Sequence, residues 1–305
     1  MEYSSSPDKI TRDYFDSLLL ETRYVDSATP DTGMDLFGEH FATPIMTAAL
    51  SHLGSGGRKS ADFIGHSAVN GMIVYAEAAA KSKAVHWIGM GSDEELKEIV
   101  ATGARCIKIV KPLEDNDEVI RELKYAADLG CMAVGMDIDH SFDAKGNYDN
   151  VFGIPMKAKS FDELKDFIQA SGVPFIAKGI LSPKDAEKCA KAGCAGIVVS
   201  HHHGMMPYSV PPLMVLEDIV GVSGKDMQVF VDCGIESGMD AYKCLALGAK
   251  AVSVGRHLMP LLKEGASAVS GRIDGMTSEL AGVMARTGVR NLNEMDASVI
   301  HRRAF

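Results

Sequence analysis

One repeating unit dominates this chain after about residue 43: a short apolar run rich in β-forming residues, a turn with Gly, Ser or Asp, then an amphipathic or Ala-rich stretch. Strands that alternate with helical stretches are typical of βα units, whose strands lie parallel in one sheet. The predicted strands are PIMTAAL (44–50), GMIVYA (71–76), CIKIVKP (106–112), CMAVGMDI (131–138), PFIAKGI (174–180), GIVVSHH (196–202), QVFVDCGI (228–235) and AVSVGRHL (251–258). Eight strands with crossovers favour a (β/α)8 barrel over a doubly wound sheet, which usually has fewer strands.

Helical stretches separate these strands, and each ends at a glycine, which is a common stop signal. The predicted helices are SDEELKEIVATG (92–103), DNDEVIRELKYAADLG (115–130), SFDELKDFIQASG (160–172), SPKDAEKCAKAG (182–193) and SGMDAYKCLALG (237–248). No linker, long charge block or shift in composition divides the 305 residues. We therefore expect one α/β domain: a single (β/α)8 TIM barrel over 44–305 with a C-terminal helix, and an N-terminal extension, 1–43, packed on it.

The glycine-rich run GSGG at 54–57 is interpreted as a loop. It lacks both the final glycine of a G-x-G-x-x-G fingerprint and an acidic residue at the distance that ribose binding needs. A dinucleotide-binding fold is therefore not expected.

The charge balance argues against nucleic acid as a partner, because 31 Lys and Arg against 41 Asp and Glu give a net charge of −10. No apolar run approaches the roughly 18 residues of a membrane span, and the N-terminus lacks the basic and apolar regions of a signal peptide. The six cysteines contain no C-x-x-C pair, so we expect buried free thiols. Together these features predict a cytoplasmic protein without a membrane partner.

Reactive groups of a barrel lie at the C-terminal ends of its strands, so the strand assignments give the candidates directly. They are Lys108, Lys111, Asp137, Asp139, His140, Lys178, His201, His202, His203, Asp232, Gly234, Gly255 and Arg256.

The last two strands end in DCGIESG (232–238) and SVGR (253–256), which bring exposed backbone N–H groups and a guanidinium together. Such groups suit a phosphate, although the glycines could instead only make tight turns. Lys178 stands in an otherwise apolar strand, where a cation needs a partner. That partner could be a flavin, a phosphate, a Schiff-base carbonyl or a carboxylate, the last as a purely structural ion pair.

The triple histidine at 201–203 has three interpretations: a catalytic base, a metal site or a structural role. Consecutive residues of an extended segment point to opposite faces, so at most two of the rings could share an ion. Asp137, Asp139 and His140 could also bind a metal, but acidic loops at strand ends are usually solvated or hydrogen-bonded. We expect a base and no metal.

Several segments, in order, resemble the FMN-dependent α-hydroxy-acid oxidases and dehydrogenases, the family of glycolate and lactate oxidase. They are ITRDYFDSLLLETRYVD, DLFGEHFATPIMTAAL, PFIAKGILSPKDAEKCAKAGCAGIVVSHHHG, QVFVDCGIESGMDAYKCLALGAKAVSVGRHL and ELAGVMARTGVRNLNEM at 279–295, the last similar to the closing helix of the family. The resemblance covers most of residues 10–300 and is strongest over 174–258. It implies an FMN-dependent oxidoreductase that acts on CH–OH groups, and a homo-oligomer, a tetramer in many members.

The resemblance assigns roles by position. Lys178 matches the catalytic lysine at the flavin N1/O2 edge, and His202 matches the catalytic base, with His203 as the alternative if the extra histidine precedes it. Ala48 and Ala49 fall where the first strand passes the flavin N5. The remaining cofactor matches are Asp232 beside the ribityl chain and Gly234, Gly255 and Arg256 around the phosphate.

The departures from the family pattern concern the substrate. HHHGMMPYS lacks the arginine that grips the substrate carboxylate, DIDHSFDAKG lacks a second one, and Glu236 replaces an arginine on the phosphate side. Lys108 stands for a family glutamine that contacts the cofactor, and we expect it to point into the barrel mouth. Lys108, His140 and His203 are then the groups expected to hold a small anionic substrate.

The resulting hypothesis is oxidation of a 2-hydroxy acid, or a related anionic substrate, to the 2-oxo product. Two alternatives stay open: an FMN-binding barrel with a redox-neutral or sensing role, and a barrel enzyme that acts on a phosphorylated metabolite.

Overall fold

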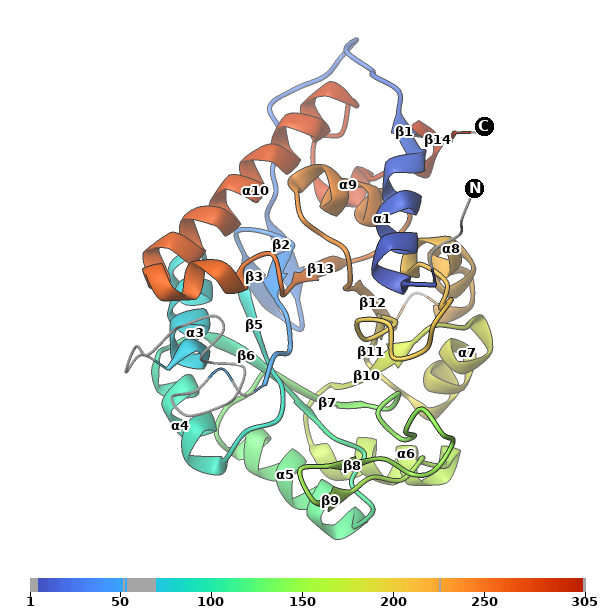
Figure 1. Ribbon diagram of the computed structural model, residues 1–305. Helices are drawn as coiled ribbons and strands as arrows, with labels where there is room; N and C mark the ends of the chain where they lie inside the picture. The colour runs from blue at the N-terminus through green and yellow to red at the C-terminus, as the bar shows by residue number, and fades with distance from the viewer. Residues whose placement is uncertain (1–4, 52, 54–69, 225, 304–305) are drawn as a thin grey trace.

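The computed structural model describes residues 5–51, 53, 70–224 and 226–303, and these form a barrel of eight parallel strands (Figure 1). In spatial order the strands are β4 (Ile45–Thr47), β13 (Ala251–Val254), β12 (Gln228–Val231), β11 (Gly196–Val199), β10 (Phe175–Ile180), β7 (Ala133–Asp137), β6 (Arg105–Val110) and β5 (Val85–Ile88). A parallel bridge between Leu50 and Ile88 brings the first and last of them together. The predicted (β/α)8 barrel is confirmed.

The second predicted strand is wrong. GMIVYA belongs to helix α3 (Gly71–Lys81), which begins after Asn70, whose side chain accepts a hydrogen bond from the Met72 N–H at 2.9 Å. A continuous apolar run suits a buried helix as well as a buried strand, and the Ala-rich continuation decides for the helix. The actual second strand is β5, whose VHWI sequence we did not predict.

The five predicted crossover helices are confirmed within about two residues at their ends. They are α4 (Asp93–Ala101), α5 (Asn116–Asp128), α6 (Phe161–Ser171), α7 (Pro183–Ala192) and α9 (Gly238–Ala246). Gly172 and Gly193 end α6 and α7 in the left-handed conformation, as the stop signal requires. Helix α8 (Pro212–Ser223) was not predicted, and the closing helix α10 runs from Ala266 to Arg286, earlier than 279–295.

Alternate residues of each strand face two packing layers. Ile107 and Ile109 of β6 pack with Trp87 inside the barrel, in one buried cluster. Cys106 and Val110 of the same strand belong to the other cluster, which lies between the strands and the helices. This alternation decides which strand side chains can reach the interior of the barrel.

Smaller elements complete the fold. They are α1 (Pro7–Ser17), β1 (Leu18–Leu20) paired with β14 (Ile300–Arg302), the hairpins β2 (Met34–Leu36)–β3 (Glu39–Phe41) and β8 (Asn150–Val151)–β9 (Ile154–Pro155), and the 3-10 helices η1 (Met259–Glu264), η2 (Leu292–Glu294) and η3 (Ala297–Val299). All six cysteines are buried free thiols, as predicted. In the described ranges no helix has both the length and the hydrophobicity to cross a bilayer. The GSGG run at 54–57 lies outside these ranges.

Candidate active site

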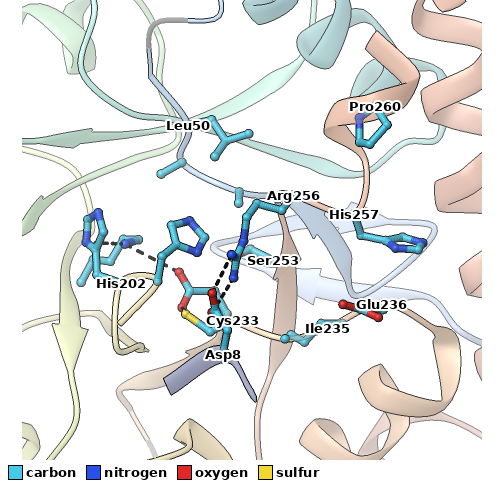
Figure 2. Close-up of a pocket in the computed structure, with 17 residues that line it drawn as sticks. Asp8, Leu50, His202, Cys233, Ile235, Glu236, Ser253, Arg256, His257 and Pro260 are labelled. Carbon is cyan, nitrogen blue, oxygen red and sulfur yellow. Dashed lines mark hydrogen bonds and ion pairs between the residues drawn. The ribbon is translucent and has the colours of Figure 1, made fainter. Parts of the chain in front are cut away.

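A cavity of about 560 Å³ opens at the C-terminal ends of the strands, within the usual size range of small-molecule sites (Figure 2). Nine of the predicted site residues line it: Ala48, Ala49, Lys178, His202, His203, Asp232, Gly234, Gly255 and Arg256. In Figure 2, His202 and His257 lie toward opposite ends of the row of lining residues, with Arg256 between them. The cavity therefore has a histidine-lysine end and an arginine end.

Lys178 lies at the centre of the histidine-lysine end. Its Nζ lies 2.9 Å from Asp137 Oδ1 and 3.6 Å from Asp232 Oδ2, and the side chain is only 6% exposed. Burial alone would lower the pKa of Lys178, but the carboxylates of Asp137 and Asp232 outweigh it and hold that pKa well above its usual value. Lys178 is therefore a fixed positive charge inside the barrel mouth.

Lys111 extends this buried charge network, because its Nζ donates to Asp137 Oδ2 at 2.8 Å. Burial tends to raise the pKa of Asp137, yet Lys178 and Lys111 keep that pKa below its usual value. Lys111 and Asp137 were both predicted as strand-end residues, Lys111 without a role and Asp137 only as a metal alternative that we did not favour. Strand alternation carried the signal, since Lys111 continues the inward-facing series of Ile107 and Ile109.

His202 joins the network through Asp139. Its Nδ1 lies 3.2 Å from Asp139 Oδ1 and 3.5 Å from the Lys178 Nζ. Gly179 makes room for this contact: its φ is +92°, and a Cβ there would stand 2.2 Å from the Asp139 Cγ. Glycine is therefore required at 179 for Asp139 to reach the histidine.

The other histidines have different surroundings. His203 lines the cavity, whereas His201 Nε2 is bonded to Thr11 of α1 at 2.9 Å. His140 lies behind His202, with ring centroids 4.5 Å apart and nearly perpendicular planes. Burial lowers the pKa of His140 and of His203 to about 4, helped by the positive charges of Lys111 and Arg256 respectively. Both rings are thus neutral near pH 7.

Asp137, Asp139 and His202 are close enough for one atom of each to ligate a common ion. However, the ammonium of Lys178 already lies 2.9 Å from the Asp137 Oδ1 and neutralises it. An additional cation would face this charge at close range. We therefore keep the prediction of a site without metal.

Arg256 dominates the second end, where its guanidinium pairs with Asp8 of α1 through contacts of 2.5 and 2.7 Å. The two residues are 248 positions apart, so no sequence signal pointed to Asp8. A Cβ on Gly255 would stand 3.1 Å from the Ala48 Cβ, so glycine keeps this wall open. Gly234 has φ +75°, and a Cβ on it would stand 2.8 Å from the Thr11 Cγ2. Gly234 therefore admits α1 to the edge of the site.

Comparison with known proteins identifies the family. The chain matches the sequence model of the FMN-dependent dehydrogenases over residues 8–160 and 154–302. This protein belongs to the FMN-dependent dehydrogenase family. The resemblance noted in its sequence is confirmed, and FMN is the cofactor of that family.

Individual relatives and solved structures are consistent with this family assignment. The chain is 36% identical to an L-lactate dehydrogenase of Pseudomonas syringae over 160 residues, 52% of this chain and 41% of that protein, so the match spans well under half of that relative. It is 28% identical to a 4-hydroxymandelate oxidase of Amycolatopsis orientalis over 86% of this chain and 80% of the relative. Among solved structures, a mandelate oxidase mutant with a monooxide FMN adduct superimposes with a TM-score of 0.82 at 26% identity, over 98% of this chain and 92% of that one.

The cavity of this family member fits FMN chemically. It has a buried cation, Lys178, at one end and an arginine, Arg256, at the other, and Ala48, Ala49 and Leu50 form a wall between them. A cation beside a flavin ring and a guanidinium beside a phosphate are the donors that such a cofactor needs.

Lys108 does not point into the mouth of the barrel, and this expectation is wrong. It alternates with the inward-facing Ile107 and Ile109, so its side chain enters the outer layer, where its Nζ donates to the Gly89 carbonyl. Burial lowers the pKa of Lys108, and Glu122 of α5 is its strongest opposing charge. Among the described residues that line the cavity, neither Lys108 nor His140 is present.

Proposed function

We propose that this protein oxidises the CH–OH group of a 2-hydroxy acid, or a related small anionic substrate, to the 2-oxo product with non-covalently bound FMN. The observation that carries this proposal is the arrangement of Asp139, His202 and Lys178 at the buried end of the cavity in a member of an FMN-dependent family. A base with an orienting carboxylate beside a fixed cation is suited to proton removal coupled to flavin reduction.

Two cations define how the cofactor is held. Lys178 would contact the flavin ring system, and Arg256 would contact the phosphate. The other cofactor contacts are Ala48, Ala49, Asp232, Gly234 and Gly255, all in the cavity wall. Bound FMN supplies the two-electron acceptor that no side chain of this chain can provide.

His202 acts as the base. Asp139 accepts a hydrogen bond from the Nδ1–H, which fixes the tautomer and leaves the lone pair of Nε2 free to accept a proton from the substrate. The Lys178 Nζ lies closer to Asp137 Oδ1, at 2.9 Å, than to His202 Nδ1, at 3.5 Å.

The substrate anion is held by neutral donors rather than by a guanidinium. Of the described residues lining the cavity, Lys178 and Arg256 carry its only ammonium and guanidinium groups, and both serve the cofactor. His203 lines the cavity and remains to donate a hydrogen bond to an anion, whereas His140 stands behind His202 and supports that ring. Neutral donors bind a carboxylate less tightly than a bidentate arginine, so we expect weak selection for a simple 2-hydroxy acid.

The deciding experiment is anaerobic mixing of the FMN-loaded protein with a panel of hydroxy acids while flavin absorbance is recorded. We expect bleaching by at least one of them, followed by recovery with an added acceptor. Bound FMN that no hydroxy acid reduces would favour the redox-neutral or sensing role. A protein that neither takes up FMN nor is thermally stabilised by it would favour a barrel enzyme acting on a phosphorylated metabolite.

We also propose a cytoplasmic location and a homo-oligomeric state. Six buried free thiols suit a reducing compartment, and the oligomer rests on resemblance to family members. Light scattering at several concentrations tests the oligomer, and a concentration-independent monomeric mass would exclude it.

A further inference from the structure

The arginine end of the cavity offers few donors for a phosphate dianion. The fork of Arg256 is occupied by Asp8, and the exposed Glu236 adds a second carboxylate to the same wall. One guanidinium shared with a carboxylate is a weak match for a doubly charged group. A second side-chain donor would add to the backbone N–H groups at this end.

His257 is the residue in position to provide it. It directly follows Arg256, lines the cavity and lies with Glu236 and Pro260 at the arginine end (Figure 2). Behind the ring, the Nε–H of Arg272 on α10 donates a hydrogen bond to the His257 Nε2 at 2.9 Å.

This contact fixes the tautomer of His257. A guanidinium can only donate hydrogen bonds, so Nε2 must be the unprotonated nitrogen of the ring. Burial and the charge of Arg272 lower the pKa of His257, so the ring is neutral and its single proton is on Nδ1. The free ring nitrogen of His257 is therefore an N–H donor rather than an acceptor.

Arg272 is itself held in place from three sides. Its Nη2 donates to the Glu236 carbonyl at 2.9 Å, and its Nη1 lies 3.1 Å from the Glu279 Oε1. The other oxygen of Glu279 accepts the Gly238 N–H at 2.7 Å, at the start of α9. Arg272 thus joins the segments after β12 and β13 to α10, and it presents His257 from a rigid support.

We infer that His257, oriented by Arg272, donates its Nδ1–H to the FMN phosphate and provides the contact missing on the side where Glu236 stands. The inference rests on the proposed function, because it takes the cavity to hold FMN. It makes His257 a cofactor-binding residue and Arg272 a positioning residue that acts through it.

The test compares FMN with riboflavin, which has the same ring system but no phosphate. Dissociation constants for both flavins are measured by fluorescence quenching on the wild type, His257→Phe, His257→Asn and Arg272→Gln. The control is His40→Phe, whose ring is 69% exposed on the β2–β3 hairpin.

We expect His257→Phe to weaken FMN about ten-fold and riboflavin less than two-fold, because a hydrogen bond to a charged group is lost. His257→Asn, which keeps an N–H donor, should retain FMN affinity within about three-fold, and Arg272→Gln should fall between the two. The control should leave both constants unchanged.

An unchanged ratio of FMN to riboflavin affinity in His257→Phe and Arg272→Gln would overturn the inference and leave the proposed function standing. Equal weakening of both flavins would also overturn it, because it would indicate a general effect on the fold. If the wild type binds neither flavin, the proposed function itself fails.

Discussion

The two ends of the cavity hold their charges in opposite ways. At the first end, Lys178, Asp137 and Asp232 are all less than 10% exposed, and their charges compensate one another inside the barrel. At the second, the side chains of Arg256 and Asp8 are 49% and 38% exposed, and Asp8 comes from the N-terminal helix. Buried charges are costly to separate, whereas exposed pairs exchange partners at little cost. The end assigned to chemistry is therefore preorganised, and the end assigned to phosphate binding is adjustable.

The largest effect is expected from a substitution that removes the buried cation. Lys178→Met leaves Asp137 and Asp232 without their shared partner, so we expect the free energy of unfolding to fall by about 3–5 kcal/mol. Urea denaturation measures it. The matched control is Lys188→Met on α7, an exposed lysine paired with Asp185, which should change stability by less than about 1 kcal/mol. Equal effects of the two substitutions would refute the contrast between buried and exposed charges.

The next effect concerns the base. His202→Asn should slow anaerobic flavin reduction by at least about 100-fold and leave the FMN dissociation constant within about three-fold, because only proton transfer is lost. His203→Asn is the matched comparison, and we expect a smaller effect on rate. If His203→Asn is the slow variant, the extra histidine precedes the base. If both variants reduce flavin at the wild-type rate, neither residue is the base.

At the arginine end, we expect two substitutions to change FMN affinity in opposite directions. Arg256→Ala should weaken FMN binding about ten-fold or more, whereas Asp8→Asn should tighten it several-fold because the phosphate no longer competes with a carboxylate. Titration at low and high salt measures both effects, which should shrink with salt. Asp13→Asn, an exposed substitution on the same helix, should change nothing. Weaker binding by Asp8→Asn would mean that Asp8 orients Arg256 for the phosphate.

The smallest effect is a pH dependence from the histidines at the buried end. The pKa of His203 and of His140 is about 4 in the fold, below the usual 6.5, so the unfolded chain binds more protons between these values. Their contribution is complete above pH 6.5 and is lost as the pH falls toward 4. We expect His203→Gln to reduce this loss by about 1 kcal/mol, less than the full shift implies, since His203 is an exposed residue. Unfolding titrations at pH 7 and pH 4.5 test it. If the free energy of unfolding falls between these pH values as much in His203→Gln as in the wild type, the assignment is contradicted.

The sequence predicted most of the barrel because its signals are local. Crossover helices with a capping serine and a terminal glycine, such as α6 and α7, were located closely. The apolar run 71–76 misled the prediction because hydrophobicity alone does not distinguish a buried helix from a buried strand. We overlooked VHWI of β5 because four residues, one of them polar, are too few to show a strand pattern of hydrophobicity.

Residue identity and strand order alone determined much of this protein: seven of the eight strands, a lysine inside an apolar strand, a histidine after the sixth strand and an arginine after the eighth. Only the tertiary structure decided which side chains meet. Lys108 lies on β6 and Lys111 directly follows that strand, yet the alternation sends Lys108 to the outer layer and Lys111 to Asp137. Asp8 reaches Arg256, and Arg272 reaches His257, because α1 and α10 pack beside the segment that follows β13. Such contacts depend on packing between distant segments, and a single sequence does not contain that information in its local pattern.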